Sequence, residues 1–119
     1  MTSPKVKSKF PAEKFQEPLG FEAFYPDLIA ERILKGLQPT CMEDKWLVYS
    51  ENEWVYFCRS WTQSHVFAIR LHPTAAGGAT VIESWFNSNK DEFKPQNSEY
   101  SRNLLSKVIH ALFEREPVV

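Results

Sequence analysis

The clearest pattern of apolar positions lies near the C-terminus and has the spacing of an amphipathic helix. Apolar side chains recur there at i, i+4, i+5, i+8, i+9, i+12 and i+13, at Tyr100, Leu104, Leu105, Val108, Ile109, Leu112 and Phe113. Asn97 or Ser98 supplies an N-cap, and Pro117 ends the run. We therefore predict a C-terminal helix that packs on a sheet through this stripe.

A shorter helix is predicted near residue 26. Pro26 suits a first helical position, and Asp27 favours the positive end of the helix dipole. Apolar residues then recur every fourth position, at Ile29, Ile33 and Leu37. Residues 1–24 carry several phenylalanines among prolines and charges, which predicts an irregular, partly mobile arm lying over a single domain at 25–119.

Four segments between the helices have the composition of β-strands. They are rich in β-branched and aromatic residues and read "KWLVYS", "EWVYFCRSW", "HVFAIRLH" and "TVIESWFN". Glu51 and Asn52 are a plausible two-residue hairpin connection. Short connections favour an antiparallel meander. The expected fold is α+β, with a four-stranded meander between a short helix and a C-terminal helix packed on one face (α-β-β-β-β-α).

Alternation along the strands predicts two faces of different composition. If Ser50 pairs with Glu53, one face carries Leu47, Tyr49, Trp54, Tyr56, Cys58, Ser60, Phe67, Ile69 and Leu71, and we expect the C-terminal helix on it. The other face then carries Trp46, Val48, Val55, Phe57, Arg59, Trp61, Arg70, Val81, Glu83 and Trp85. A slip of one residue would invert the assignment of a strand.

The second face has two interpretations. It is either a smaller core in which Arg59 or Arg70 pairs with Glu83, because a buried charge requires a partner, or a recognition surface. Tryptophan and arginine dominate binding surfaces, since they combine large contact area with directional donors. The candidate binding residues are Arg59, Trp61, Trp85, Trp46, Arg70 and Glu83.

Composition and charge narrow the classes of function. Fourteen basic and fifteen acidic side chains give a net charge of −1, which argues against binding to duplex nucleic acid. The sequence contains no stretch of about 18 apolar residues, so we expect no membrane insertion. The two cysteines, Cys41 and Cys58, fit a reducing cytoplasm.

Catalytic and metal chemistry find little support. Histidines and cysteines lack the close spacings of zinc ligands, so we predict no metal and no cofactor. A nucleophile–base arrangement of Ser60, His65 and Glu83 can be drawn, but no nucleophile signature accompanies it. We expect a protein that is not an enzyme.

The segment "KWLVYSENEWVYFCRSWTQSHVFAIRL" resembles an uncharacterised family of small bacterial proteins and appended domains. In that family an aromatic strand is followed by a His-Arg-Ser-Trp-Thr-Gly signature. Arg59, Ser60, Trp61 and Thr62 fit the signature, whereas Cys58 replaces its histidine and a glutamine its glycine. The later "ESWFNSNKDEF" is similar to the family's Asn-rich segment. The resemblance implies a bacterial, cytoplasmic setting and an association with proteins of ADP-ribosylglycohydrolase type.

Two functions follow as hypotheses. The first is a non-enzymatic immunity- or accessory-type module that binds a protein partner through the Trp/Arg face, with the "NSNKDEF" loop as its rim. The second is a domain that binds a small nucleotide-like ligand linked to ADP-ribose chemistry, with Arg59 on phosphate and Trp61 stacked on the base. An exposed edge strand could in either case pair two copies of the chain.

Overall fold

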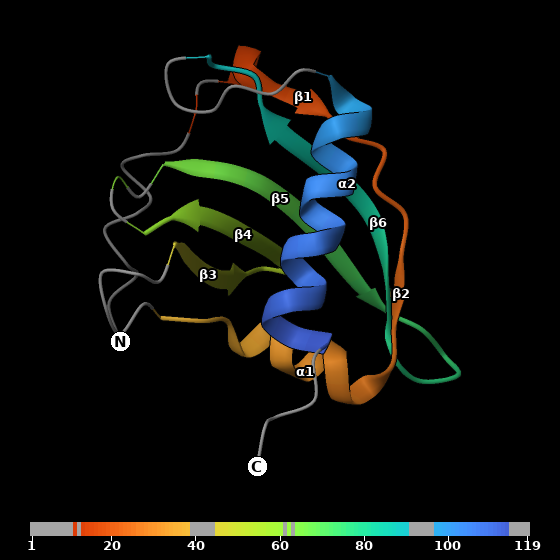
Figure 1. Cartoon of the computed structure of the whole chain (residues 1–119). Coiled ribbons are helices and arrows are strands. Elements are labelled where there is room, and N and C mark those ends of the chain that lie inside the picture. Colours follow the sequence, from red (N-terminus) through yellow and green to blue (C-terminus); the bar gives the residue numbers. More distant parts are fainter. Residues whose placement is uncertain are drawn as a thin grey trace.

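One antiparallel sheet forms the centre of the fold, and two helices pack on one of its faces (Figure 1). The computed structural model describes residue 11 and residues 13–38, 45–60, 62, 64–90 and 97–114. The elements before the central strands are the 3-10 turn η2 (Glu13–Phe15), strands β1 (Gln16–Pro18) and β2 (Phe24–Tyr25), and helix α1 (Asp27–Lys35). They are followed by β3 (Trp46–Glu51), β4 (Trp54–Arg59), β5 (His65–Pro73), β6 (Ala79–Asn87), helix α2 (Ser98–Ile109) and the π-helical turn η3 (His110–Glu114). The predicted α+β class with an antiparallel sheet and a C-terminal helix is confirmed.

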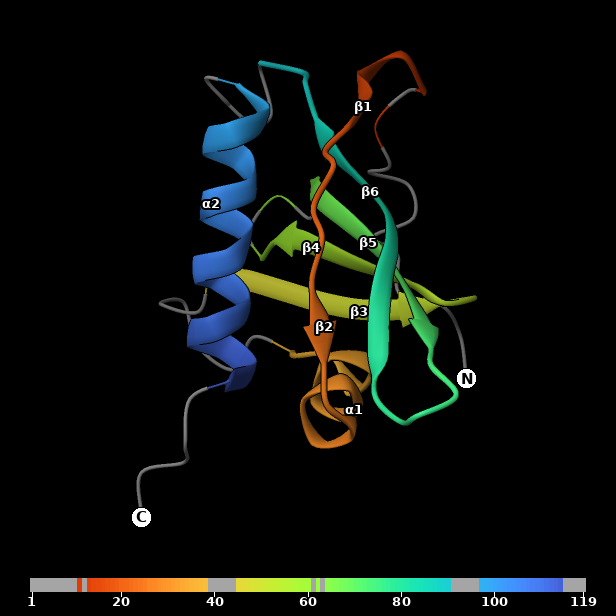
Figure 2. The ribbon, with the colours of Figure 1, turned by 90° about the vertical axis from the view of Figure 1, so that its right-hand side faces the viewer.

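The sheet has six strands, so the predicted number of four is wrong. The central order is β1-β6-β5-β4-β3, and β2 also pairs with β6. Figure 2 shows β1 and β2 following one another along the same edge of β6. The described part of the N-terminal arm therefore belongs to the sheet instead of lying over it, while residues 1–10 of that arm lie outside the described residues.

The β3–β4 hairpin turns one residue later than predicted. Glu51 pairs with Trp54, and the turn consists of Asn52 and Glu53 with φ angles of 53° and 73°. Two successive positive φ angles are what a tight two-residue hairpin turn requires. The predicted Ser50–Glu53 pairing is wrong, but the register differs by two positions, so the predicted grouping of side chains within this hairpin is kept.

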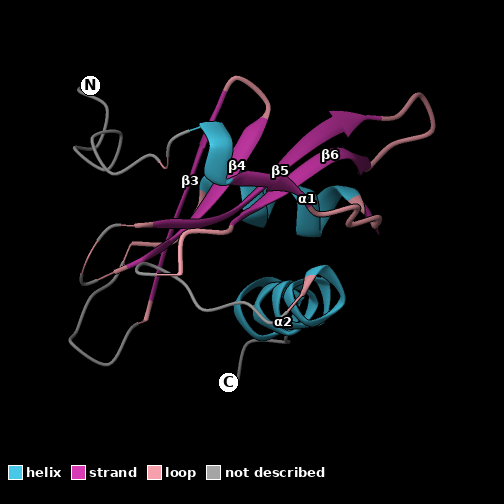
Figure 3. Cartoon of the chain, turned by 90° about the horizontal axis from the view of Figure 1, so that it is seen from above, coloured by secondary structure: helices cyan, strands magenta, loops and turns pink. Residues whose placement is uncertain are grey.

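Helix α2 lies on the opposite side of this hairpin from the one predicted. The main core contains Val48, Val55, Phe57, Phe67, Ile69, Leu105 and Ile109, and so joins the sheet to α2 (Figure 3). A second, smaller cluster on the other face contains Leu47, Tyr49, Tyr56, Cys58, Ala68 and Trp85. Sequence reasoning assigned Phe67 and Ile69 correctly to the helix side, and it assigned the apolar residues of β3 and β4 to the wrong sides.

Helix α2 begins at the residue that the sequence predicts and packs on the sheet through part of its predicted apolar stripe. The Asn97 side chain accepts a hydrogen bond of 2.7 Å from the Tyr100 backbone N–H, which confirms the predicted N-cap. From this cap α2 buries Leu105, Val108 and Ile109 in the main core, whereas Tyr100, predicted to belong to the apolar stripe, is exposed. No helix in the described parts of the chain is long and apolar enough to cross a bilayer.

Gly36 ends α1 and lets the chain return to the sheet edge. Its φ of 78° and ψ of −169° form a combination that is essentially restricted to glycine. Leu37, predicted to lie in this helix, follows its end and instead exchanges two backbone hydrogen bonds of 2.9 Å with Val48. A Cβ atom on Gly36 would clash with the Val48 carbonyl oxygen and lie 3.1 Å from its carbon. Both the backbone conformation and the close approach of two chains thus require glycine.

Gly36→Ala is expected to lower the free energy of unfolding by about 2–4 kcal/mol, because the substitution adds a backbone clash to an unfavourable φ. Gly20→Ala is the matched control, with a φ of 69° and only the Arg102 Nη1 atom, at 3.8 Å, near the added Cβ. It should cost about 1 kcal/mol. Denaturant unfolding of both variants measures the difference, and equal losses would contradict this role of Gly36.

Candidate functional site

The six predicted binding residues do not share one face of the sheet. Trp46 packs against the main core on the helix side, and Arg59 is its cross-strand partner. The Arg59 guanidinium carbon lies 4.7 Å from the centre of the Trp46 ring, a cation–π distance. Trp85 belongs to the cluster on the opposite face. The predicted common Trp/Arg surface is therefore wrong.

Arg70, Glu83 and Trp85 do lie together on the face away from α2. Arg70 is the cross-strand partner of Glu83, and Trp85 is the partner of Ala68, two residues along the same strands. Trp61 lies outside the described residues, as does the 91–93 part of the loop predicted to form the rim.

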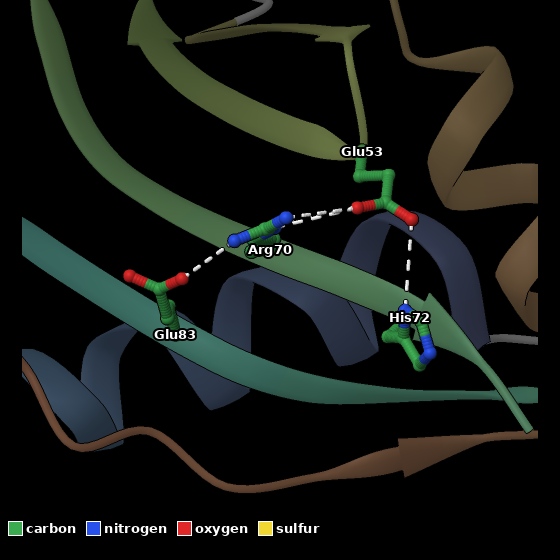
Figure 4. A network of polar contacts seen from close by, with 4 residues as sticks. All are labelled: Glu53, Arg70, His72 and Glu83. Atoms are coloured by element: carbon green, nitrogen blue, oxygen red, sulfur yellow. Dashed lines mark hydrogen bonds and ion pairs between the residues drawn. The ribbon is translucent and has the colours of Figure 1, made fainter.

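Arg70 is held by two carboxylates (Figure 4). Its Nη1 donates to Glu83 Oε1 at 2.8 Å, and its Nε and Nη2 donate to Glu53 Oε1 at 3.3 and 3.2 Å. His72 Nδ1 lies 3.6 Å from the other oxygen of Glu53. The hydrogen bonds that Arg70 donates to Glu83 and then to Glu53 raise the pKa of Arg70 above its ordinary value.

This network changes the role expected of Arg70. The predicted pairing of an arginine with Glu83 is confirmed for Arg70, although both side chains are exposed and not buried. Exposed ion pairs add little to stability. Their consequence is one of charge, because two carboxylates outweigh the single positive charge of Arg70, and this disfavours the approach of a ligand's phosphate or carboxylate.

A groove lies beside this network on the sheet face away from α2, and it is lined by β6, by the arm that pairs with the edge of β6, and by Trp54 of β4. Its volume is about 640 Å³, and its lining includes Trp54, Trp85, Glu83, Gln16 and Glu22. Trp54 is half-buried and packs against the second cluster, with its ring stacked 6.4 Å from that of Tyr56. The groove therefore offers a partly exposed indole on a rigid aromatic support.

An irregularity in strand pairing accompanies the groove. Pro18 pairs with Trp85 and Phe24 pairs with Thr80, so five arm residues lie opposite four residues of β6. The backbone N–H of Phe21 is bound by the Ser84 hydroxyl, at 2.9 Å, in place of a carbonyl of the ladder. The arm thus leaves the regular sheet pattern where it borders the groove.

The groove is acidic. Glu13, Glu22 and Glu83 line it, and no lysine, arginine or histidine does so within the described ranges. A positively charged or hydrogen-bond-donating group would be favoured at this surface, and a phosphate would be repelled.

Tyr49 and His65 form a buried polar pair on the same face of the sheet. The Tyr49 hydroxyl lies 2.7 Å from His65 Nε2, and Asn87 Nδ2 donates to the His65 carbonyl at 2.9 Å. Burial, followed by the influence of Cys58, Tyr56 and Glu51, raises the pKa of Tyr49 above its ordinary value.

The hypothetical nucleophile–base arrangement is not assembled. His65 is fully buried, whereas Glu83 is exposed and pairs opposite Arg70. Arg70 lies five residues further along β5, a separation of about 17 Å at the usual rise of a strand. Ser60 follows the end of β4 at which Cys58 pairs with His65, whereas Glu83 lies near the opposite end, beside Arg70, so the three side chains are not brought together.

No group of three or more histidine, cysteine, aspartate or glutamate side chains could hold a metal ion in the part of the chain that the structure describes. Cys41 lies outside that part.

Sequence reasoning named Trp85 and Glu83 among the binding residues but missed most of the other residues that line the groove. Trp54 was assigned to the face beneath the C-terminal helix, and Glu13, Gln16 and Glu22 were assigned to an irregular arm. One signal was present, since Gln16, Pro18 and Glu22 occupy alternate positions of the arm and all line the groove. Alternation in a segment containing prolines would have indicated an edge strand.

Cys58 should react slowly in the folded protein. Burial raises the pKa of its thiol to about 12, so the reactive thiolate is almost absent at pH 8. In a Cys41→Ser variant, thiol modification is expected to be at least about a hundredfold slower in buffer than in denaturant. Stability should also fall as pH rises above about 8.5, because the unfolded thiol then loses its proton while the folded one keeps it. Equal rates in buffer and in denaturant would contradict this burial.

Comparisons with known proteins leave the resemblance of the Arg-Ser-Trp-Thr segment as a prediction. No protein-family model, curated protein or solved structure matches the chain.

Proposed function

We propose that the chain is a non-enzymatic protein-interaction module and that it binds its partner in the groove lined by β6, the N-terminal arm and Trp54. The observation that carries the proposal is the combination of Trp54 and Trp85 with three carboxylates in one groove of about 640 Å³. Tryptophan dominates protein interfaces because a rigid ring with a polar N–H buries a large area with little loss of conformational entropy.

The support beneath the groove suits an anchor for a partner. The ring of Tyr56 lies 6.4 Å from the rings of both Trp54 and Trp85, and Tyr56 and Trp85 are buried. Trp54 is consequently held from one side and remains partly accessible from the other. A side chain already ordered in the free protein costs less to immobilise when a partner binds.

The alternative, a nucleotide-like ligand, finds less support in the geometry. Arg59 lies over Trp46 on the helix side of the sheet, and Arg70 is bound by Glu53 and Glu83. Neither guanidinium joins the groove, and the groove's own charges are carboxylates. A phosphate would therefore meet repulsion at the surface that has the aromatic rings.

Trp54→Ala is expected to weaken binding to the partner at least about thirtyfold, the effect of losing a central interface tryptophan. The partner would first be identified by affinity purification, then purified and titrated against wild-type and variant chains by calorimetry. Ile82→Ala provides a second test, because Ile82 lines the groove and is exposed, so its loss should not disturb folding.

Leu28→Ala is the matched control, since Leu28 is an exposed leucine on α1 that does not line the groove. It should leave the dissociation constant unchanged. Unchanged affinity in both groove variants, with folding verified by circular dichroism, would refute the proposed binding surface.

A further inference from the structure

Resting on the proposed function, we propose that the groove binds an extended, basic segment of the partner protein, with one lysine or arginine side chain on Trp54. The carboxylates of Glu22 and Glu83, which line the groove with Trp54, would accept hydrogen bonds from this cation and its neighbours. The proposal names the chemistry of the partner and depends on charge, aromatic geometry and groove shape.

The charge of the groove favours an occupant with positive charge. Three glutamates line the groove without a lysine, arginine or histidine among its described lining residues. Glu83 already accepts from Arg70, yet its side chain stays about half exposed, at 55%. Because Arg70 is also engaged by Glu53, the surroundings of the groove remain negative. A cationic segment is steered toward such a surface and an anionic one is turned away.

The indole of Trp54 supports a cation in particular. Tryptophan is the best aromatic ring for a cation–π contact. The molecule itself contains contacts of this kind elsewhere. The Arg59 guanidinium carbon lies 4.7 Å from the Trp46 ring centre, and Lys14 Nζ lies 5.0 Å from that of Phe15. A ring beside carboxylates combines cation–π attraction with ionic hydrogen bonds, which favours the ends of lysine and arginine over apolar side chains.

The shape of the groove fits an extended chain. Strand β6 contributes residues 80–85 to the groove lining, and these residues span about 17 Å at the usual strand rise. The arm runs alongside β6, where the Leu19 N–H donates to the Ser84 carbonyl at 3.0 Å, and it adds Pro18 and Gly20 to the groove lining. About five residues of an extended segment could lie along these residues of β6.

The test uses the whole chain of 119 residues and three synthetic peptides of about seven residues in a serine–alanine background. The basic peptide carries one central arginine flanked by lysines, the neutral peptide replaces these with glutamine, and the acidic peptide replaces them with glutamate. Binding is followed through the indole N–H signal of Trp54 in two-dimensional NMR spectra, assigned by its loss in Trp54→Phe.

The basic peptide should shift the Trp54 signal in a saturable manner and bind at least about tenfold more tightly than the neutral peptide, while the acidic peptide should not bind. A Glu22→Gln, Glu83→Gln double variant should weaken binding of the basic peptide about tenfold or more, and added salt should weaken it further. Glu99→Gln on α2 is the control and should change nothing, because this exposed carboxylate does not line the groove.

Equal binding of the basic and neutral peptides, or no binding of the basic one, would overturn the inference. If Trp54→Ala weakened binding to the purified partner, the proposed function would still stand. Failure of the inference can therefore be distinguished from failure of the proposed function. Residues 1–10 of this chain contain Lys5, Lys7 and Lys9 and no acidic residue. If the basic peptide bound only after these three were changed to glutamine, the occupant would be the chain's own N-terminal segment, and the inference of a partner segment would be wrong.

Discussion

The pairing of Phe57 with Phe67 across β4 and β5 determines which side of the sheet every neighbouring residue occupies. Both rings are fully buried in the core beneath α2, beside the equally buried pair of Val55 and Ile69. Removing two phenylalanines from water contributes several kcal/mol of free energy, far more than any exposed ion pair on the sheet. Once these rings face α2, strand alternation sends Tyr56 to the opposite face.

The opposite face then acquires its character from the same alternation. Arg70 and Glu83 become cross-strand neighbours there, and Trp85 joins Tyr56 and Trp54 in the second cluster. The arm pairs with the outer edge of β6 and borders a groove beside these residues. An acidic groove with the partly exposed indole of Trp54 thus follows from the side of the sheet on which Phe57 and Phe67 are buried.

The sequence was sufficient for the helices and for the strands that follow one another. The apolar stripe of α2, its cap at Asn97 and the β5 residues Phe67 and Ile69 on the helix side were all predictable, because each depends on local spacing. The partnership of an arginine with Glu83 was also predictable, since it follows from adjacent strands and opposite charges.

The faces of β3 and β4 could not be predicted in the same way. Every residue of β4 between its two ends is buried, so the strand is apolar on both sides and its pattern does not distinguish them. A bulge between Phe57 and Cys58 adds an extra residue to the pairing with β5, which local patterns do not reveal. The arm was missed because Pro18 argues against a strand, although proline is tolerated at the edge of a sheet, where β1 lies.

The central claim is that α2 covers the Phe57–Phe67 face and leaves the tyrosine-bearing face to form the groove. Nuclear Overhauser contacts from the methyl groups of Leu105 and Ile109 test it most directly, since these contacts decay within a few ångströms. The structure predicts contacts from these methyls to the aromatic rings of the main core, Phe57 and Phe67 among them. Contacts to the rings of Tyr49 and Tyr56 instead would contradict the account, because α2 would then lie on the other side of the sheet.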